Sequence, residues 1–123
     1  RDDIDKENIA FFGTSWGGRL GGIMVAIEDR FKTAILMVGG MRVQNKKPEA
    51  DPLHFLPRIK IPILMLNGRY DHFFPVETSQ IPMYNFLGTD QKNKKHIIYD
   101  TGHYIPFNDL VNESLNWLQN YLK

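Results

Sequence analysis

The apolar residues of the chain gather in four short runs, with longer mixed segments between them. The runs span residues 9–12, 33–38, 61–66 and 96–99. Short continuous apolar runs are typical of strands that are buried on both faces of a sheet. Pro62, near the start of the third run, stands where a strand tolerates proline. The pattern therefore predicts four strands.

The segment after the first run, residues 16–31, has the period of an amphipathic helix. Its predicted buried face consists of Leu20, Ile23, Met24, Ile27 and Phe31. The same segment carries Gly18, Gly21 and Gly22, and each glycine costs a helix about 1 kcal/mol relative to alanine. That cost favours a helix whose backbone lies close against the sheet.

A second helix is expected over residues 75–87. Pro75 suits its first position and Gly88 ends it. Pro82 should break or kink this helix near residue 80, because proline removes a hydrogen-bond donor and clashes with the preceding turn.

The last helix is expected over residues 109–122, with Asn108 as its cap. The 3.6-residue period predicts one buried stripe along it. The residues of that stripe are Leu110, Val111, Leu115, Leu118 and Leu122, widened by Trp117 and Tyr121.

The remaining segments have no regular period. Residues 42–58 contain three prolines and predict a loop with one helical turn near residues 52–55, and residues 89–95 predict a polar loop. Strands joined through helices or long crossovers lie parallel, in a sheet that is covered on both sides. We therefore expect an α/β fold, a three-layer sandwich with a mostly parallel sheet, in which residues 1–123 form one domain.

Composition excludes several classes of function. The chain has 42% hydrophobic and 24% charged residues, and its net charge of +1 gives no field that would attract nucleic acid or an anionic membrane. It has no cysteine, and therefore neither a disulfide framework nor a thiolate metal site nor a cysteine nucleophile. No pair of histidines has metal-ligand spacing, so neither a metal nor another cofactor is expected.

Cellular context follows from the same residues. No apolar run reaches membrane-spanning length, and no signal peptide is visible. With no cysteine to oxidise, the composition fits the cytoplasm. The chain opens at Arg1 rather than at methionine, so we expect it to be cut from a longer one.

The first strand runs directly into Gly13-Thr14-Ser15-Trp16-Gly17, where a helix is predicted to begin. Gly-x-Ser-x-Gly between a strand and a helix is the nucleophile elbow, a strained turn that exposes the serine hydroxyl. The residues two before and two after the serine must have almost no side chain, and Gly13 and Gly17 meet that need. The structural alternative is a glycine-rich turn with an ordinary capping serine. The flanking strand and helix favour the elbow.

Two later turns supply the residues that would activate this serine. Asp71 follows the third strand and His103 follows the fourth. The carboxyl ends of parallel strands meet along one rim of the sheet, where ligands bind in open α/β folds. An imidazole can take the serine proton, and a carboxylate fixes its tautomer and stabilises the resulting cation. The sequence therefore predicts a triad of Ser15, His103 and Asp71.

Each of these residues also has an ordinary interpretation. Asp71 could bind the backbone of its own turn, and His103 could be a surface turn residue. All three in order at successive turns favour the triad. His72 adjoins Asp71, and neighbours on one turn rarely face each other as acid and base must. Asp100 is a rival acid, and its closeness to His103 in sequence argues against it.

The order Ser, Asp, His resembles that of the α/β-hydrolase-fold serine hydrolases. Segments 13–18, 62–71 and 102–103 are similar to that family's elbow, acid turn and histidine turn. The short spacings and the doubled glycine after the serine resemble the dienelactone hydrolase and prolyl oligopeptidase-like branch. The resemblance covers nearly the whole chain, but only the C-terminal half of the family's fold.

The resemblance implies a role for each residue of the motif. Ser15 would be the nucleophile, His103 the general base and acid, and Asp71 the orienting carboxylate. The backbone N–H of Trp16 would be one oxyanion donor. The family's N-terminal strands are absent, and with them the loop that supplies a second donor. Losing one such donor typically costs about a hundred- to a thousand-fold in rate.

Two functions from different classes follow. The first is a serine esterase that cleaves carboxylic esters or short peptides through an acyl-enzyme, in a pocket that would include Met41, Phe73 and Tyr104. The second is a catalytically impaired half-domain that self-associates or binds a complementing chain through its open sheet edge, since an unpaired strand is prone to association. An acyltransferase that uses the same acyl-enzyme is a weaker third.

Overall fold

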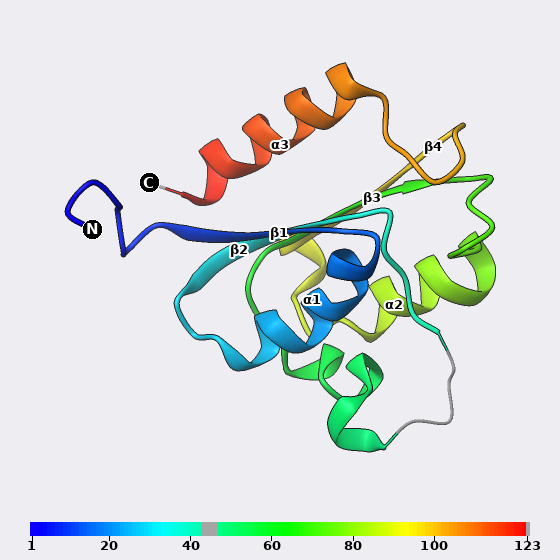
Figure 1. Cartoon of the computed structure of the whole chain (residues 1–123), viewed down its shortest axis with the longest axis horizontal. Helices are drawn as coiled ribbons and strands as arrows, with labels where there is room; N and C mark the ends of the chain where they lie inside the picture. Colours follow the sequence, from blue (N-terminus) through cyan, green and yellow to red (C-terminus); the bar gives the residue numbers. More distant parts are fainter. Residues whose placement is uncertain (43–46, 123) are drawn as a thin grey trace.

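The computed structural model describes residues 1–42 and 47–122 of the chain (Figure 1). Four strands form one sheet in the order β1-β2-β3-β4, and every neighbouring pair is parallel. The strands are β1 (Ile9–Thr14), β2 (Phe31–Met37), β3 (Ile63–Gly68) and β4 (Lys94–Tyr99). The predicted parallel sheet is therefore confirmed, with strand ends that differ by a few residues.

Helices cover both faces of the sheet. Helix α1 (Trp16–Ile27) and helix α2 (Ile81–Phe86) lie on one side, and helix α3 (Phe107–Tyr121) lies on the other (Figure 1). A five-residue π-helical turn, η4 (Val76–Gln80), precedes α2. The predicted interruption near residue 80 is therefore present, and Pro82 stands in the first turn of α2, where a missing N–H is tolerated.

The predicted buried face of the first helix is wrong. Helix α1 ends at Ile27, and Phe31 begins β2 instead of completing a helical stripe. Leu20, Met24 and Ile27 are 41%, 46% and 59% exposed. The buried residues of α1 are Gly18, Arg19, Gly21, Gly22 and Val25.

The glycines explain this orientation of α1. A Cβ at Gly18 would lie 2.9 Å from the carbonyl oxygen of Met37 and 3.0 Å from Cα of Gly39. Only a helix surface without side chains can come this close to the strand ends, so close approach to the sheet is observed, as expected. The close approach involves the glycine face of α1, which the hydrophobic periodicity did not predict to be buried.

The last helix also differs from expectation at its start and in its stripe. It begins at Phe107 after Pro106, so Asn108 lies inside the first turn and is not the cap. Trp117 is its only buried residue, and Leu115 is 52% exposed. The Trp117 indole N–H donates to Oγ1 of Thr33 over 2.7 Å, and this contact fixes the helix on the sheet. The residues that pack beside Trp117 are Leu110, Leu118 and Tyr121.

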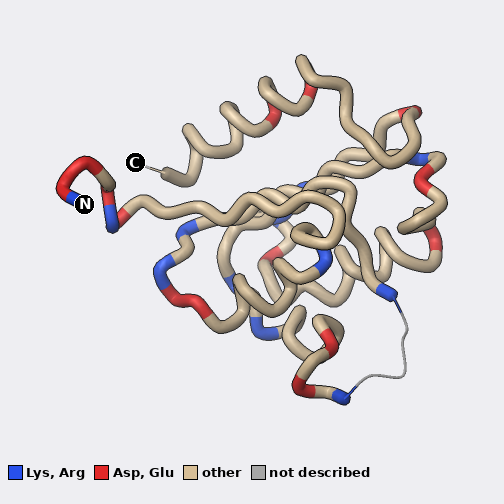
Figure 2. The backbone as a smooth tube through the Cα atoms, viewed as in Figure 1, with Lys and Arg blue, Asp and Glu red and all other residues tan. Residues whose placement is uncertain are grey.

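The loops are largely as expected. The segment that joins β2 to β3 contains three short 3-10 turns, η1 (Pro48–Ala50), η2 (Pro52–His54) and η3 (Leu56–Arg58), where the sequence predicts one. A further turn, η5 (Gln91–Asn93), precedes β4. Figure 2 shows acidic and basic residues interspersed along the loops and the N-terminal turn, in keeping with the near-zero net charge.

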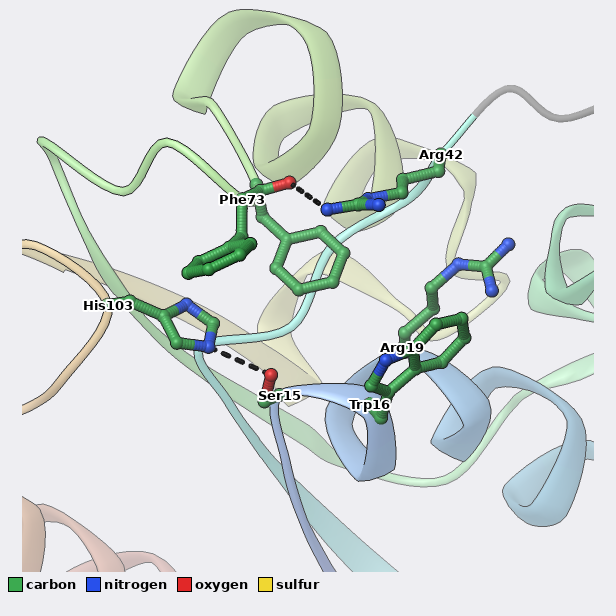
Figure 3. Close-up of a pocket in the computed structure, with 7 residues that line it drawn as sticks. Ser15, Trp16, Arg19, Arg42, Phe73 and His103 are labelled. Carbon is green, nitrogen blue, oxygen red and sulfur yellow. Dashed lines mark hydrogen bonds between the residues drawn. The ribbon is translucent and has the colours of Figure 1, made fainter.

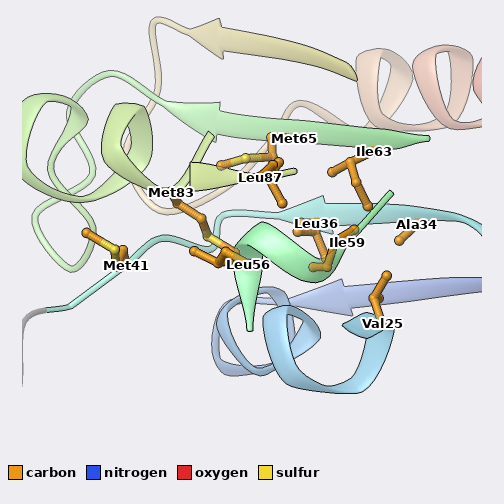
Figure 4. Packing of buried hydrophobic residues seen from close by; sticks show 10 residues of the cluster. All are labelled: Val25, Ala34, Leu36, Met41, Leu56, Ile59, Ile63, Met65, Met83 and Leu87. Carbon is orange, nitrogen blue, oxygen red and sulfur yellow. The ribbon is translucent and has the colours of Figure 1, made fainter. Parts of the chain in front are cut away.

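The core has one cluster on each face of the sheet. The β3 side chains alternate between the two clusters, and Ile63, Leu64, Met65 and Leu66 are all fully buried. Each such side chain contributes about 1.5–3 kcal/mol through burial. The cluster beneath α1 and α2 consists of Val25, Ala34, Leu36, Met41, Leu56, Ile59, Ile63, Met65, Met83 and Leu87 (Figure 4). Within the described residues, no helix is both long and apolar enough to cross a membrane.

Candidate active site

Ser15 forms the whole of the turn between β1 and α1. Its backbone has φ 55° and ψ −108°, outside the regions that residues with a side chain prefer. Its N–H donates to the carbonyl oxygen of Met37 over 2.8 Å, and its carbonyl accepts from the N–H of Arg19 over 2.9 Å. These bonds from the next strand and the next helical turn hold the strained conformation, as at many functional sites.

The two glycines of the motif differ in importance. A Cβ at Gly13 would overlap the carbonyl oxygen of Gly17 and lie 2.7 Å from the ring of Phe11. A Cβ at Gly17 would meet no described atom within 4 Å. The predicted need for a residue without a side chain is therefore confirmed at Gly13. At Gly17 there is room for a side chain.

Two hydrogen bonds connect Ser15, His103 and Asp71. Nδ1 of His103 lies 2.7 Å from Oδ2 of Asp71, and Nε2 of His103 lies 2.8 Å from Oγ of Ser15 (Figure 3). An ionised carboxylate can only accept, so the neutral imidazole carries its proton on Nδ1. Nε2 is then unprotonated and accepts from the serine hydroxyl. The structure brings the three predicted residues into one chain of hydrogen bonds.

The carboxylate of Asp71 is held by the backbone of its own turn. The side chain is buried, and Oδ1 accepts from the N–H groups of Phe73 and Phe74 over 2.8 Å and 3.1 Å. Oδ2 is thereby directed to His103. The two interpretations of Asp71 are thus compatible: it closes its turn with one oxygen and contacts the histidine with the other.

The acid turn and the histidine turn are joined through their backbones. The N–H of Arg69 donates to Tyr99 over 2.8 Å, and the N–H of Tyr70 donates to Thr101 over 2.9 Å. A Cβ at Gly68 would overlap the carbonyl oxygen of Gly102. This close contact between β3 and the loop after β4 sets the separation between Asp71 and His103.

The rival residues lie outside this chain of hydrogen bonds. Asp100 pairs with Arg69 at 2.7 Å, on the surface. His72 is exposed, and its ring contacts that of Phe73 in a tilted arrangement. His96 is largely buried in β4, and its Nε2 lies 3.0 Å from Oδ1 of Asn67. Burial lowers the pKa of His96 to about 4, so this histidine is neutral at pH 7.

A cavity of about 200 Å³ opens beside Ser15. Its lining residues are Ser15, Trp16, Arg19, Arg42, Phe73, Phe74 and His103 (Figure 3). Of the predicted pocket residues, only Phe73 lines it. Met41 lies in the core cluster beneath α1 and α2, and Tyr104 is 60% exposed on the surface, so neither reaches this cavity.

Sequence reasoning missed Arg19 and Arg42 as lining residues. Arg19 lies four residues after Ser15, one helical turn along α1 and among the glycines that face the sheet. A charged residue on a glycine face is the signal that could have identified it. Across residues 1–42 and 47–122, no group of three or more metal-ligating side chains is arranged to hold a metal ion.

Comparison with known families gives a match over most of the chain. The family model described as Serine hydrolase (FSH1) matches residues 9–115. No curated protein sequence shows a significant match.

Solved structures share the fold. A cold-adapted esterase from an Arctic intertidal metagenomic library has 22% identity and a TM-score of 0.82, over 96% of this chain and 51% of the esterase. A putative dienelactone hydrolase from Klebsiella pneumoniae subsp. pneumoniae MGH 78578 has 22% identity and a TM-score of 0.79, over 95% and 54% of the two chains. The Pyrococcus horikoshii acylaminoacyl peptidase has 18% identity and a TM-score of 0.68, over 98% and 23%. The chain thus spans about half the length of the first two proteins.

Proposed function

Because the chain belongs to the FSH1 serine hydrolase family, we propose that it hydrolyses carboxylic esters, or short peptides, by forming an acyl-enzyme on Ser15. The observation that carries this proposal is the pair of hydrogen bonds, 2.7 Å and 2.8 Å long, from Asp71 through His103 to Ser15. The 2.8 Å distance lies within the range for a nucleophile and its base, and the 2.7 Å distance is that of a base oriented by a third group.

Acylation begins when Oγ of Ser15 attacks the ester carbonyl carbon while Nε2 of His103 takes the hydroxyl proton. Asp71 stabilises the imidazolium that forms. The carbonyl oxygen becomes an oxyanion, for which the N–H of Trp16 and the positive end of α1 are the proposed stabilising groups. The tetrahedral intermediate then expels the alcohol, which receives the proton from His103, and leaves the acyl group on Ser15.

Deacylation repeats the same proton transfers with water. His103 takes a proton from the water that attacks the acyl carbon, and the second tetrahedral intermediate collapses to release the acid. The proton returns to Oγ of Ser15, which restores the free site. Every step uses groups of this chain, and no cofactor enters.

Turnover of an activated ester tests the proposal. With 4-nitrophenyl butyrate, His103→Ala should lower kcat/KM by at least about a thousandfold, because the serine loses its base. His54→Ala is the matched control, since His54 is exposed on η2, and it should retain the parent value. Equal rates for the parent and His103→Ala would contradict the assignment of the base.

An assembly role is the second candidate, and exposed apolar residues favour it. Trp16, Leu20, Met24 and Ile27 form a stripe along α1 and are 41–59% exposed. In the described residues β1 pairs only with β2, so its other edge is open. This chain matches 51% of the cold-adapted esterase, so about half of that esterase has no counterpart here. We infer that the α1 stripe and the open edge of β1 bind a complementing segment like the unmatched half of that esterase. When such a segment is absent, they bind a second copy of this chain.

A further inference from the structure

Two arginines line the cavity beside Ser15 in a way that hydrolysis of a simple ester does not require. Arg19 comes from α1 and is 1% exposed. Arg42 comes from the segment after β2 and is partly buried. Figure 3 shows both side chains on the side of the cavity away from His103.

The Arg19 guanidinium has no hydrogen-bond partner among the described residues. Its Nε, Nη1 and Nη2 atoms are all buried and unbonded. Buried charges in proteins are ordinarily paired, because removing an ion from water costs several kcal/mol. An arginine with three unbonded nitrogens is therefore an exception that needs a physical explanation.

The two charges that act on Arg19 have opposite effects. Burial lowers its pKa; Asp51 acts in the opposite direction and Arg42 lowers it further. Asp51 makes no hydrogen bond to Arg19, and its Oδ1 accepts from the N–H of Leu53 over 3.1 Å. Arg19 and Arg42 thus repel one another at the wall of one cavity, and an anion placed there would reduce this repulsion.

Both guanidinium groups are already held in position. The Arg19 guanidinium lies 5.2 Å from the centroid of the Trp16 ring, and that of Arg42 lies 5.1 Å from the Phe74 centroid. Nη2 of Arg42 also donates to the carbonyl oxygen of Phe73 over 3.0 Å. This bond uses one N–H group of Arg42, and its remaining N–H groups are available for a ligand. Groups fixed in advance lose little entropy on binding.

The rest of the lining is apolar. Trp16, Phe73 and Phe74 supply three aromatic side chains to the cavity that Ser15 and the arginines also line. An apolar cavity with Ser15 on one side and the arginines on the other suits an aliphatic chain with the scissile ester at one end and a negative charge at the other (Figure 3).

We propose that the cavity selects esters whose acyl group ends in a carboxylate, that is, monoesters of small dicarboxylic acids. Arg42 binds the carboxylate directly, and the buried positive charge of Arg19 lies behind it. The inference rests on the proposed ester hydrolysis at Ser15, but the carboxylate site itself is defined by the arginines.

A matched pair of substrates tests the site. The 4-nitrophenyl monoester of adipic acid and 4-nitrophenyl hexanoate have acyl chains of equal length, and a carboxylate replaces a methyl group in the first. We expect kcat/KM to favour the monoadipate by about ten- to a hundredfold, the range for hydrogen bonds to a charged group. Arg42→Gln should remove most of this preference, and Arg42→Lys should restore part of it.

Arg30→Gln is the matched control, because it removes the same charge from the exposed turn between α1 and β2. It should keep the preference in full. A preference that is absent in the parent, or that Arg30→Gln lowers as much as Arg42→Gln, would overturn the proposal.

A second measurement separates this proposal from the proposed hydrolysis. Calorimetric titration of Ser15→Ala with adipate needs no turnover, and binding that Arg42→Gln abolishes supports the carboxylate site even if no ester is hydrolysed. Hydrolysis of both esters at similar rates, with no adipate binding, overturns the site and leaves the esterase proposal standing. If neither ester is hydrolysed and adipate does not bind, both proposals are overturned.

Arg19→Met shows whether Arg19 has a structural role instead. If Arg19 serves the site, this variant should weaken the preference for the monoadipate and leave the midpoint of urea unfolding unchanged or raised, since an unpaired buried charge is removed. A lowered midpoint with an unchanged preference would make Arg19 a structural partner of Asp51 and remove it from the proposal.

Discussion

At the scale of single residues, the three members of the proposed triad are fixed by different forces. Ser15 is held in a strained backbone conformation by two backbone hydrogen bonds. Asp71 is held by two N–H groups of its own turn. His103 lies between them and is oriented by its bonds to both. The sequence predicts these three residues because each stands alone in a turn after a strand.

The strain and the distances were beyond sequence reasoning, since both depend on neighbouring strands. The same holds for Arg19 and Arg42, which sequence reasoning did not connect with the site. A charge is ordinarily exposed to solvent, and only the packing of α1 against the sheet shows that Arg19 is buried.

His96 should make stability depend on pH. Its pKa is lowered by burial to about 4 in the folded chain, whereas an unfolded histidine titrates near 6.5. The unfolded state therefore binds more protons between these values, and the free energy of unfolding falls as the pH drops from about 6.5 to about 4. The contribution of His96 that is lost amounts to about 2–3 kcal/mol.

Urea unfolding at several pH values, for the parent and His96→Gln, checks this dependence. Glutamine keeps a donor for Oδ1 of Asn67 but does not titrate, so the stability of the variant should fall less steeply below pH 6.5. His54→Gln, at an exposed position, is the control and should follow the parent. Identical slopes for the parent and His96→Gln would show that folding does not lower the pKa of His96.

At the scale of elements, strands are predicted well and helix faces poorly. The run at residues 61–66 overlaps β3, because a strand buried on both sides must be apolar throughout. The buried face of α1 was predicted wrongly, because the 3.6-residue period identifies only apolar side chains. In the structure, the three glycines lie on the buried face instead. The Trp117 anchor of α3 is likewise a tertiary contact, to a threonine on β2.

The contact between β3 and the histidine turn leads to a prediction about Gly68. Gly68→Ala should lower the free energy of unfolding by about 1–3 kcal/mol, because the new methyl group would overlap the carbonyl oxygen of Gly102. Gly102→Ala is the matched control, since a Cβ there meets no described atom within 4 Å, and its effect should stay within about 0.5 kcal/mol. Urea unfolding measures both changes, and equal effects would contradict the proposed close contact.

At the scale of the whole molecule, this chain carries all three residues of the proposed triad on a four-stranded sheet. The cold-adapted esterase and the putative dienelactone hydrolase, whose fold it shares, are about twice as long. An exposed apolar stripe on α1 and an open edge at β1 are the surfaces that a larger sheet would cover. The hydrolase and assembly proposals thus concern adjoining surfaces of the same fold, which share Trp16.

Self-association should follow from the exposed stripe. In sedimentation velocity at micromolar concentration, we expect the chain to form dimers or larger species. Met24→Glu should shift them toward monomer, because the new charge would have to be buried in the interface. Glu77→Gln, at an exposed position on η4, is the control and should leave the distribution unchanged. A monomeric parent would contradict the assembly proposal.

The central claim is that the hydrogen-bonded triad activates Ser15, and covalent trapping tests it most directly. The intact mass of the chain would be measured after exposure to a fluorophosphonate, for the parent and for Ser15→Ala. We predict one adduct on the parent and none on the variant. An unmodified parent, or an adduct that persists on Ser15→Ala, would contradict the claim.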